Sequence, residues 1–247
     1  MPASSTVLQI RSLTKILESG GSRFELRIPD LSFQRGRFYG IVGRSGSGKS
    51  SLLDLLAMVS RPTMVDTYEL IADRETVDLA NIVQSGDDAE ISRIRLRHFG
   101  YILQSGGLFS FLTVRENLQL PFILAGIEVN EDTIRQFVEL YDMVAQLDKK
   151  PSQLSGGQRQ RVSILRALSL SPQIVLADEP TASVDENMAE VIVGELKRLS
   201  QLNGVTVIMV SHDLDLVRSF ADEIITLRPE MIGANSTLSV IGQGGAG

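Results

Sequence analysis

The stretch Phe38-Tyr39-Gly40-Ile41-Val42-Gly43-Arg44-Ser45-Gly46-Ser47-Gly48-Lys49-Ser50 decides the fold of this chain. Its first five residues form an apolar run that predicts a short buried strand, and the leucines that follow recur at helical spacing up to Val59. Between the two elements, residues 43–50 match the pattern G-x-x-x-x-G-K-[ST] in full. A glycine-rich turn between a strand and a helix is the context that this phosphate-binding pattern requires, so a turn that binds nothing is disfavoured.

Each residue type in this turn has a role in holding a nucleotide. Glycines let the backbone wrap closely, so that its N–H groups and the helix N-terminus point at the β- and γ-phosphates. Lys49 is expected to neutralise phosphate charge, and the Ser50 hydroxyl to ligate Mg²⁺. The predicted binding residues here are Gly43, Arg44, Ser45, Gly46, Ser47, Gly48, Lys49, Ser50 and Ser51.

Length and composition limit the class of protein. A chain of 247 residues, 43% hydrophobic and 22% charged, can bury a core and is unlike a collagen, coiled-coil or disordered sequence. It has no cysteine, which excludes disulfides and a cysteine nucleophile. The net charge of -6 supplies no general attraction to nucleic acid. The apolar runs are too short to cross a bilayer, and the first residues show no pattern of an export signal. Both observations predict a cytoplasmic protein.

The rest of the chain alternates between strand and helix patterns. Residues 7–33 alternate apolar and polar side chains around Ser19-Gly20-Gly21-Ser22, which predicts an antiparallel hairpin. Residues 87–97 predict a charged, solvated face, and residues 131–147 an amphipathic helix. Later helices alternate with buried strands, the order of a parallel α/β sheet. These predicted strands are residues 174–177, 205–210 and 224–227.

A second nucleotide element is the apolar strand Ile174-Val175-Leu176-Ala177 that ends in two acids, Asp178 and Glu179. Asp178 at the strand tip is expected to hold Mg²⁺, and Glu179 to polarise the attacking water. Two acids before the turn-forming Pro180 could simply end a strand. The phosphate-binding turn in the same chain favours the catalytic interpretation.

A third element, Leu154-Ser155-Gly156-Gly157-Gln158, precedes a predicted helix over residues 159–170. A serine and bare glycine N–H groups at a helix start form an anion site. One triphosphate rarely needs two such sites in one chain, so this one is expected to close on nucleotide held by a second copy. The residues assigned to it are Ser155, Gly156, Gly157 and Gln158.

Together these motifs resemble the nucleotide-binding domains of the ATP-binding cassette (ABC) family over about residues 7–227. The resemblance also rests on Tyr101-Ile102-Leu103-Gln104, Thr181-Ala182-Ser183-Val184-Asp185 and Ser211-His212-Asp213. It implies one α/β domain, residues 1–241, with a P-loop NTPase core and a mostly parallel sheet, followed by a flexible glycine-rich tail at 242–247. The expected parts are an antiparallel β subdomain at about 1–35 and 65–80, and a helical subdomain with the signature motif at about 105–170.

The resemblance also implies the roles of single residues. Gln104 would contact Mg²⁺ and the water and couple to a membrane partner, and His212 would reach the γ-phosphate. Ser183 and Asp185 would communicate between two nucleotide sites. Without the resemblance, His212 would fit a helix cap and Gln104 a polar loop residue. The implied catalytic residues are Glu179, His212 and Gln104, and the implied metal ligands are Ser50, Gln104 and Asp178.

Within the family, residues 98–104 and 112–118, with Pro121 and Ala125-Gly126, most resemble the branch that pairs with MacB-type or lipoprotein-releasing (LolD-like) membrane subunits. The implied protein is a Mg²⁺-dependent ATPase that forms a head-to-tail homodimer. It would act on an integral membrane permease at the cytoplasmic face of the inner membrane, for export, lipoprotein release or signalling. Selectivity would then belong to the permease.

Two other classes of protein share some of these motifs. A soluble ABC ATPase acting on ribosomes or nucleic acid usually has two cassettes or a long coiled coil, and this chain shows neither pattern, although Arg159, Arg161 and Arg166 keep that alternative open. A regulator that binds nucleotide without hydrolysis would lack Glu179 or His212, and both are present.

Two features depart from the family pattern. Leu17 stands at or near the place where the family has an aromatic residue that stacks on adenine. Phe24 is the alternative, although a core position in the hairpin explains it more simply. Residues 78–97 depart from the usual compact form, and the sequence assigns them no function.

Overall fold

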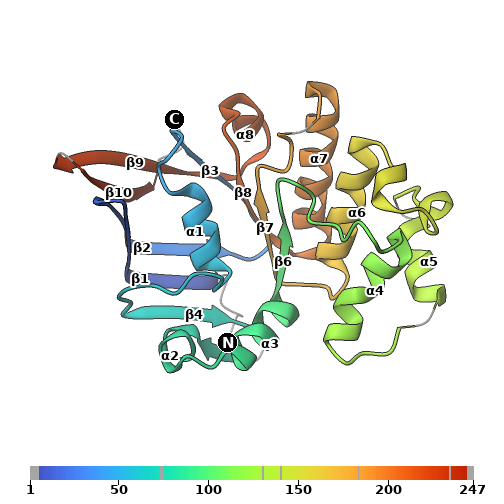
Figure 1. Cartoon of the computed structure of the whole chain (residues 1–247), viewed down its shortest axis with the longest axis horizontal. Helices are drawn as coiled ribbons and strands as arrows, with labels where there is room; N and C mark the ends of the chain where they lie inside the picture. The colour runs from blue at the N-terminus through green and yellow to red at the C-terminus, as the bar shows by residue number, and fades with distance from the viewer. Residues whose placement is uncertain are drawn as a thin grey trace.

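The computed structural model describes residues 6–72, 75–129, 131–139, 141–182, 184–233 and 235–243. Ten strands form a single sheet in the order β5-β4-β1-β2-β10-β9-β3-β8-β7-β6 (Figure 1). The strands are β1 (Thr6–Ser19), β2 (Ser22–Gln34), β3 (Phe38–Gly43), β4 (Thr67–Ile71), β5 (Thr76–Asp78), β6 (Phe99–Ile102), β7 (Ile174–Asp178), β8 (Thr206–Val210), β9 (Glu223–Gly233) and β10 (Ser236–Gln243). The helices are α1 (Lys49–Leu56), α2 (Leu79–Ser85), α3 (Asp88–His98), α4 (Val114–Leu124), α5 (Glu131–Glu139), α6 (Gly156–Leu168), α7 (Glu186–Asn203) and α8 (Leu214–Phe220), with short 3-10 turns η1 (Val144–Gln146) and η2 (Pro151–Gln153).

Strands β6, β7, β8, β3 and β9 run parallel to one another and form the predicted α/β core. Their apolar runs are buried on both faces, as a parallel sheet between helices requires. Along β7, Ile174 and Leu176 join the core beneath α1, whereas Val175 and Ala177 join the core with α6, α7 and α8. The sheet therefore separates two cores, and its carboxyl-end edge is left for the loops that carry polar groups.

The predicted hairpin is confirmed as β1 and β2, which pair from Thr6↔Gln34 to Ser19↔Ser22. The two turn residues have φ angles of 57° and 79°, a left-handed conformation that glycine adopts without a side-chain penalty. Gly20 and Gly21 therefore fix the register of the hairpin. That register places Leu17 directly opposite Phe24.

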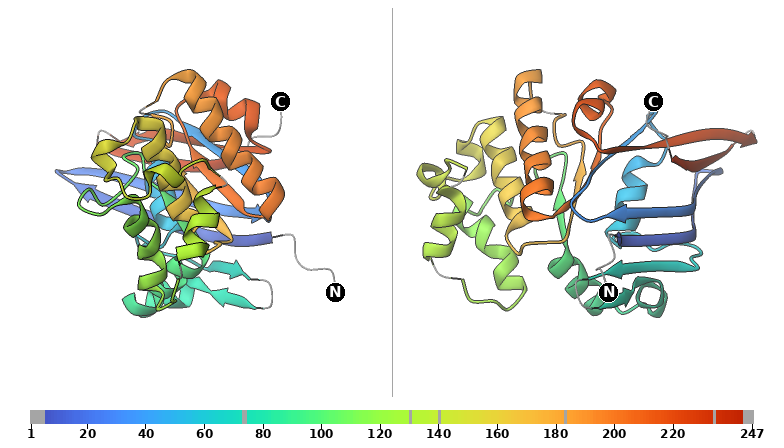
Figure 2. Two further views of the ribbon diagram at one scale, coloured as in Figure 1. Left: turned by 90° about the vertical axis from the view of Figure 1, so that its right-hand side faces the viewer. Right: turned by 180° about the vertical axis from the view of Figure 1, so that it is seen from behind.

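The sheet as a whole is mixed, because the predicted parallel core continues into the predicted antiparallel part. Strand β10 runs antiparallel to β9 and parallel to β2, so the β9–β10 hairpin joins the antiparallel part (Figures 1 and 2). The predicted ranges 1–35 and 65–80 did not include this hairpin. Gly242 and Gln243 pair with β9, so the predicted tail begins inside a strand, and residues 244–247 lie outside the described residues.

Residues 78–97 form helices rather than only a charged surface. The Asp78 carboxylate accepts the Asn81 N–H at the start of α2, and Asp87 caps α3 in the same way. In α3, Ile91 and Ile94 are buried in the core beside the β sheet, while the arginine side chains alternate toward solvent. The predicted solvated face is therefore one side of an amphipathic helix.

The helical part comprises α4, α5 and α6 with the two 3-10 turns, and it has a small core of its own. It lies on the opposite side of the molecule from the β9–β10 hairpin (Figure 1). The amphipathic helix predicted over residues 131–147 ends at Glu139, and η1 follows it. Asp142 takes a φ of 54°, which a continuing right-handed helix cannot contain. In the described residues, no helix combines the length and the apolar character needed to cross a membrane.

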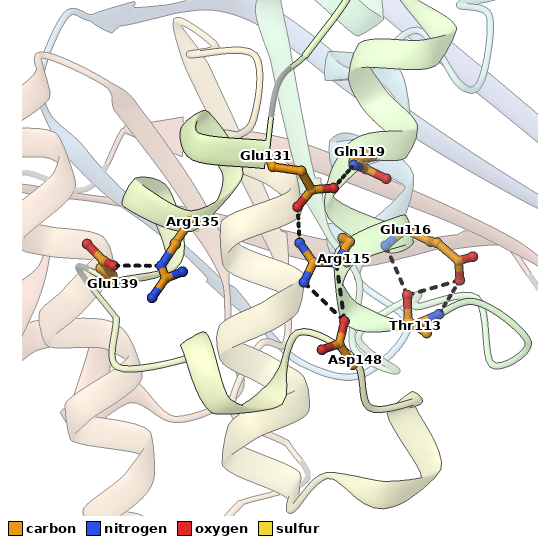
Figure 3. Close-up of polar contacts among 8 residues, drawn as sticks. All are labelled: Thr113, Arg115, Glu116, Gln119, Glu131, Arg135, Glu139 and Asp148. Atoms are coloured by element: carbon orange, nitrogen blue, oxygen red, sulfur yellow. Dashed lines mark hydrogen bonds and ion pairs between the residues drawn. The ribbon is translucent and has the colours of Figure 1, made fainter.

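Arg115 joins three segments of this helical part (Figure 3). Its guanidinium on α4 pairs with Glu131 at the start of α5 and, at 3.0 Å, with Asp148 before η2. Thr113 and Glu116 form a capping box that starts α4. Residues 112–118, which carried part of the family resemblance, therefore hold the helical part together.

Candidate functional site

A cavity of about 630 Å³ opens where the carboxyl ends of β3 and β7 meet the N-terminus of α1. Most of the predicted site residues meet here although they are widely separated in the sequence. The lining residues are Leu17, Phe24, Ser45, Gly46, Ser47, Gly48, Lys49, Ser50, Ser51, Gln104, Asp178, Glu179 and His212. Gly43 and Arg44 lie at its base, where both backbone carbonyls accept hydrogen bonds from the Lys49 ammonium, at 2.9 and 3.3 Å.

The glycine-rich turn gives this cavity an anion-binding wall. Gly46 and Gly48 have φ angles of 75° and 93°, so the turn needs glycine at both positions. Helix α1 starts directly after Gly48 without a side-chain cap, which leaves its first N–H groups for a ligand. These N–H groups, the helix dipole and the Lys49 ammonium together favour bound phosphate.

Phe24 covers one side of the turn. A Cβ atom added to Gly48 would lie 2.7 Å from the Phe24 ring, so ring and glycine are in direct contact. Phe24 also packs against the main core, and its cross-strand partner Leu17 is 42% exposed. Phe24 is thus both a hairpin core residue and, with Leu17, an apolar wall of the cavity.

Asp178 and Ser50 form the oxygen-rich side of the cavity. The Ser50 hydroxyl donates to the Asp178 carboxylate at 3.3 Å. Burial raises the pKa of Asp178, the Ser50 hydrogen bond opposes that shift, and the nearby carboxylates of Glu179 and Asp54 add to it. The sequence had not indicated Asp54, which reaches this region from α1 and accepts a hydrogen bond from Tyr101.

A magnesium ion fits the donors on this side. Mg²⁺ prefers hard oxygen ligands and usually keeps several waters, so a hydroxyl, a carboxylate and an amide oxygen suffice beside phosphate. Ser50, Asp178 and Gln104 provide these groups in the same cavity. Within the described ranges, no group of three or more His, Cys, Asp or Glu side chains forms a separate metal site.

Glu179 and His212 are in direct contact. The His212 Nδ1 atom lies 2.5 Å from a Glu179 carboxylate oxygen, a pairing that sequence analysis did not predict. Glu179 has a φ of 48°, and its N–H donates to the carbonyl of Val210, two residues before His212. A left-handed glutamate is costly and is held here by its surroundings, as is common at functional sites. The turn thereby places the carboxylate toward the cavity.

Residues 155–158 are not among the residues that line this cavity. Ser155 caps α6, its hydroxyl accepting the Gln158 N–H while the Gln158 side chain accepts the Ser155 N–H. This capping box leaves the N–H groups of Gly156 and Gly157 without a partner among the described residues. Asp185 caps α7, its carboxylate accepting the Met188 N–H, and Ser183 lies outside the described residues.

The parallel core, the glycine-rich turn with its lysine and the two acids at the end of β7 define a phosphate-loop nucleoside triphosphatase. A family model described as "ABC transporter" matches residues 26–182. The chain belongs to the ABC transporter family: it is an ABC ATPase, an ATP-binding subunit of the transporters of that family.

The comparisons with known proteins confirm the resemblance. Over 230 residues the chain is 36% identical to the uncharacterized ABC transporter ATP-binding protein MJ0796 of Methanocaldococcus jannaschii, covering 90% of this chain and 93% of that protein. Over 225 residues it is 36% identical to the macrolide export ATP-binding/permease protein MacB of Aggregatibacter actinomycetemcomitans, covering 90% of this chain but 33% of MacB. The chain thus spans about a third of that relative.

A solved structure has the same fold. The dimeric structure of MJ0796 in a post-hydrolysis state, bound to ADP and Pi, matches with a TM-score of 0.75 at 34% identity. The match covers 90% of this chain and 94% of the MJ0796 chain.

Proposed function

We propose that this ATPase works as a head-to-tail homodimer that drives an integral membrane permease of the MacB or LolD-associated kind. The observation that carries the dimer is the separation of the two phosphate-binding elements within one chain. Gly156 and Gly157 present N–H groups that have no partner in the described part of the chain, and residues 155–158 do not line the cavity. A two-fold related copy would supply them to the nucleotide, and the same contact would occur twice. The dimeric MJ0796 structure with ADP and Pi supports this arrangement.

Each residue of the cavity then has a defined task. The N–H groups of residues 45–51 and the Lys49 ammonium hold the phosphates of ATP. Ser50, Asp178 and Gln104 would hold Mg²⁺, which supplies positive charge to the phosphate oxygens when bound. Glu179 accepts a proton from the attacking water, and His212 holds the Glu179 carboxylate beside the γ-phosphate. The products are ADP and phosphate.

Bound ATP favours the closed dimer because only that state adds the contacts of residues 155–158 to the phosphates. Hydrolysis removes the γ-phosphate link and allows the dimer to open. Asp185, together with Ser183, would relay this change between the two sites. A permease that moves when the dimer opens would be bound to the ATPase. This contact would hold the ATPase at the cytoplasmic face of the inner membrane.

The nucleoside of ATP would contact the apolar wall formed by Leu17 and Phe24. Phe24→Ala is expected to raise the KM for ATP about fivefold, because losing one aromatic contact costs about 1 kcal/mol, and to leave kcat unchanged. Steady-state kinetics with ATP and GTP would check this. Leu202→Ala, at a 70% exposed apolar residue of α7 outside the cavity, is the control. An unchanged KM in Phe24→Ala would contradict the contact.

An exposed aromatic pair, five and seven positions after Gln104 in the sequence, provides the surface for the permease. Phe109 is 43% and Phe111 68% exposed, and their rings meet edge to face at 5.7 Å. The fully buried Asn117 fixes their loop by accepting the Phe109 N–H and donating to the carbonyls of Phe109, Leu112 and Thr113. Rigid exposed aromatics are typical anchors of protein interfaces. Their place after Gln104 would connect the permease to the nucleotide.

The arginines of α6 argue against a partner made of nucleic acid. Arg159 donates to the carbonyl of Leu154, Arg161 pairs with Glu195, and Arg166 donates to the carbonyl of Gly107. Each guanidinium is thus engaged within the chain, and the net charge is -6. These three arginines therefore no longer favour the alternative of a soluble ABC ATPase that acts on ribosomes or nucleic acid.

Affinity purification from detergent-solubilised membranes tests the permease. Glu179→Gln, kept with ATP and Mg²⁺, is expected to recover a polytopic membrane protein with a large extracytoplasmic domain, identified by mass spectrometry. Adding Phe111→Asp to the same variant is expected to reduce that recovery at least about tenfold, because a charge at an interface anchor must be desolvated. Recovery of ribosomal or DNA-associated proteins without a membrane subunit would contradict the proposal.

A further inference from the structure

Gln104 lines the nucleotide cavity, but its own side chain does not fix its position. The residue is exposed, and its side chain has no hydrogen-bond partner among the residues that the structure describes. Its place is therefore set by the backbone on either side. Leu103 and Gly106 close a turn around it, with the Gly106 N–H donating to the Leu103 carbonyl at 2.8 Å.

Helix α6 holds the segment that follows Gln104. The buried Ser163 hydroxyl donates to the Gly106 carbonyl at 2.7 Å, and the Arg166 guanidinium donates to the Gly107 carbonyl at 2.6 Å. Both glycines have left-handed φ angles, 74° and 60°, which turn these carbonyls toward the helix. The Arg166 side chain is partly buried, and a hydrogen bond from a charged donor is stronger than one between neutral groups.

The same helix also holds the strand that precedes Gln104. A Cβ atom on Gly100 of β6 would lie 2.4 Å from the carbonyl oxygen of Ala167, so the backbones of β6 and α6 are in direct contact. Successive positions of α6 thus contact the chain both before and after Gln104. A shift of the backbone at Gln104 would therefore disturb these contacts with α6.

We propose that Ser163 and Arg166 are positioning residues for Gln104: their hydrogen bonds to the carbonyls of Gly106 and Gly107 hold the turn that places Gln104 over the cavity. This inference rests on the proposed role of Gln104 at the nucleotide.

A double-mutant cycle tests the connection, because two residues that act through one another have non-additive effects. Ser163→Ala is expected to lower kcat about fivefold, to raise the Mg²⁺ concentration for half-maximal turnover, and to leave the KM for ATP unchanged. In a Gln104→Ala background the same change is expected to alter kcat less than twofold. Ser169→Ala is the matched control, since its hydroxyl bonds to carbonyls of Leu118 and Leu165 rather than to this turn.

A second pair of variants separates positioning from folding. Arg166→Gln is expected to lower kcat as Ser163→Ala does. Arg166→Lys keeps a charged donor and is expected to recover part of kcat, while the two Arg166 variants have the same melting temperature. Equal losses of kcat for Ser163→Ala in both backgrounds, or full turnover by Gln104→Ala, would overturn the inference. Failure of the proposed function has a different signature, because it would leave Glu179→Gln with normal turnover.

Discussion

Replacing Glu179 with glutamine is expected to lower ATP turnover at least about 100-fold, the usual contribution of a general base. The amide keeps the size of the carboxylate and can still bond to His212, which lies 2.5 Å away. It cannot accept the proton of the attacking water. The phosphate-binding turn is unchanged by this substitution, so nucleotide binding should remain. The ATP-bound dimer should therefore persist, because the γ-phosphate link is not removed.

Phosphate release, binding of a fluorescent ATP analogue and the mass of the ATP-bound species would be measured together. Glu128→Gln, at an exposed glutamate of the helical part, is the matched control and is expected to behave as the unchanged protein. Low turnover of the isolated subunit does not affect the comparison, since both variants are measured against the same protein. Normal turnover in Glu179→Gln would contradict the assigned role and the proposed mechanism.

Lys49→Met is expected to weaken ATP binding about 10- to 100-fold, since a hydrogen bond to a charged group contributes about 1.5–3 kcal/mol. The ammonium bonds to the carbonyls of Gly43 and Arg44, which places its charge within the curve of the turn. Methionine has a similar length but no charge. The phosphates would then face only the backbone N–H groups and the end of α1.

Equilibrium binding of the fluorescent ATP analogue at fixed Mg²⁺ measures this loss, and circular dichroism confirms that the variant is folded. Lys150→Met, at an exposed lysine of the helical part, removes the same charge outside the cavity and is expected to bind normally. Equal affinity in Lys49→Met and Lys150→Met would show that the turn does not hold the phosphates.

The predictions that succeeded concern contiguous residues. Residues 38–56 form the predicted strand, turn and helix. Each of these elements depends on residues close together in the sequence: an apolar run, glycines that adopt positive φ, and leucines at helical spacing. The β1–β2 hairpin follows for the same reason, since Gly20-Gly21 is a sufficient turn. In contrast, the helix predicted over residues 131–147 is interrupted at Asp142, where no glycine or proline marks the break.

The sequence by itself determined which chemical groups this protein brings to a nucleotide and the parallel core that carries them, because motif spacing and hydrophobic periodicity are local properties. Tertiary structure alone decided which distant groups meet. It placed Phe24 on Gly48, His212 on Glu179, and α6 against the turn of Gln104. It also inserted β10 beside β2. These contacts depend on how the two cores pack against the sheet, and packing joins residues whose separation in sequence carries no periodic signal.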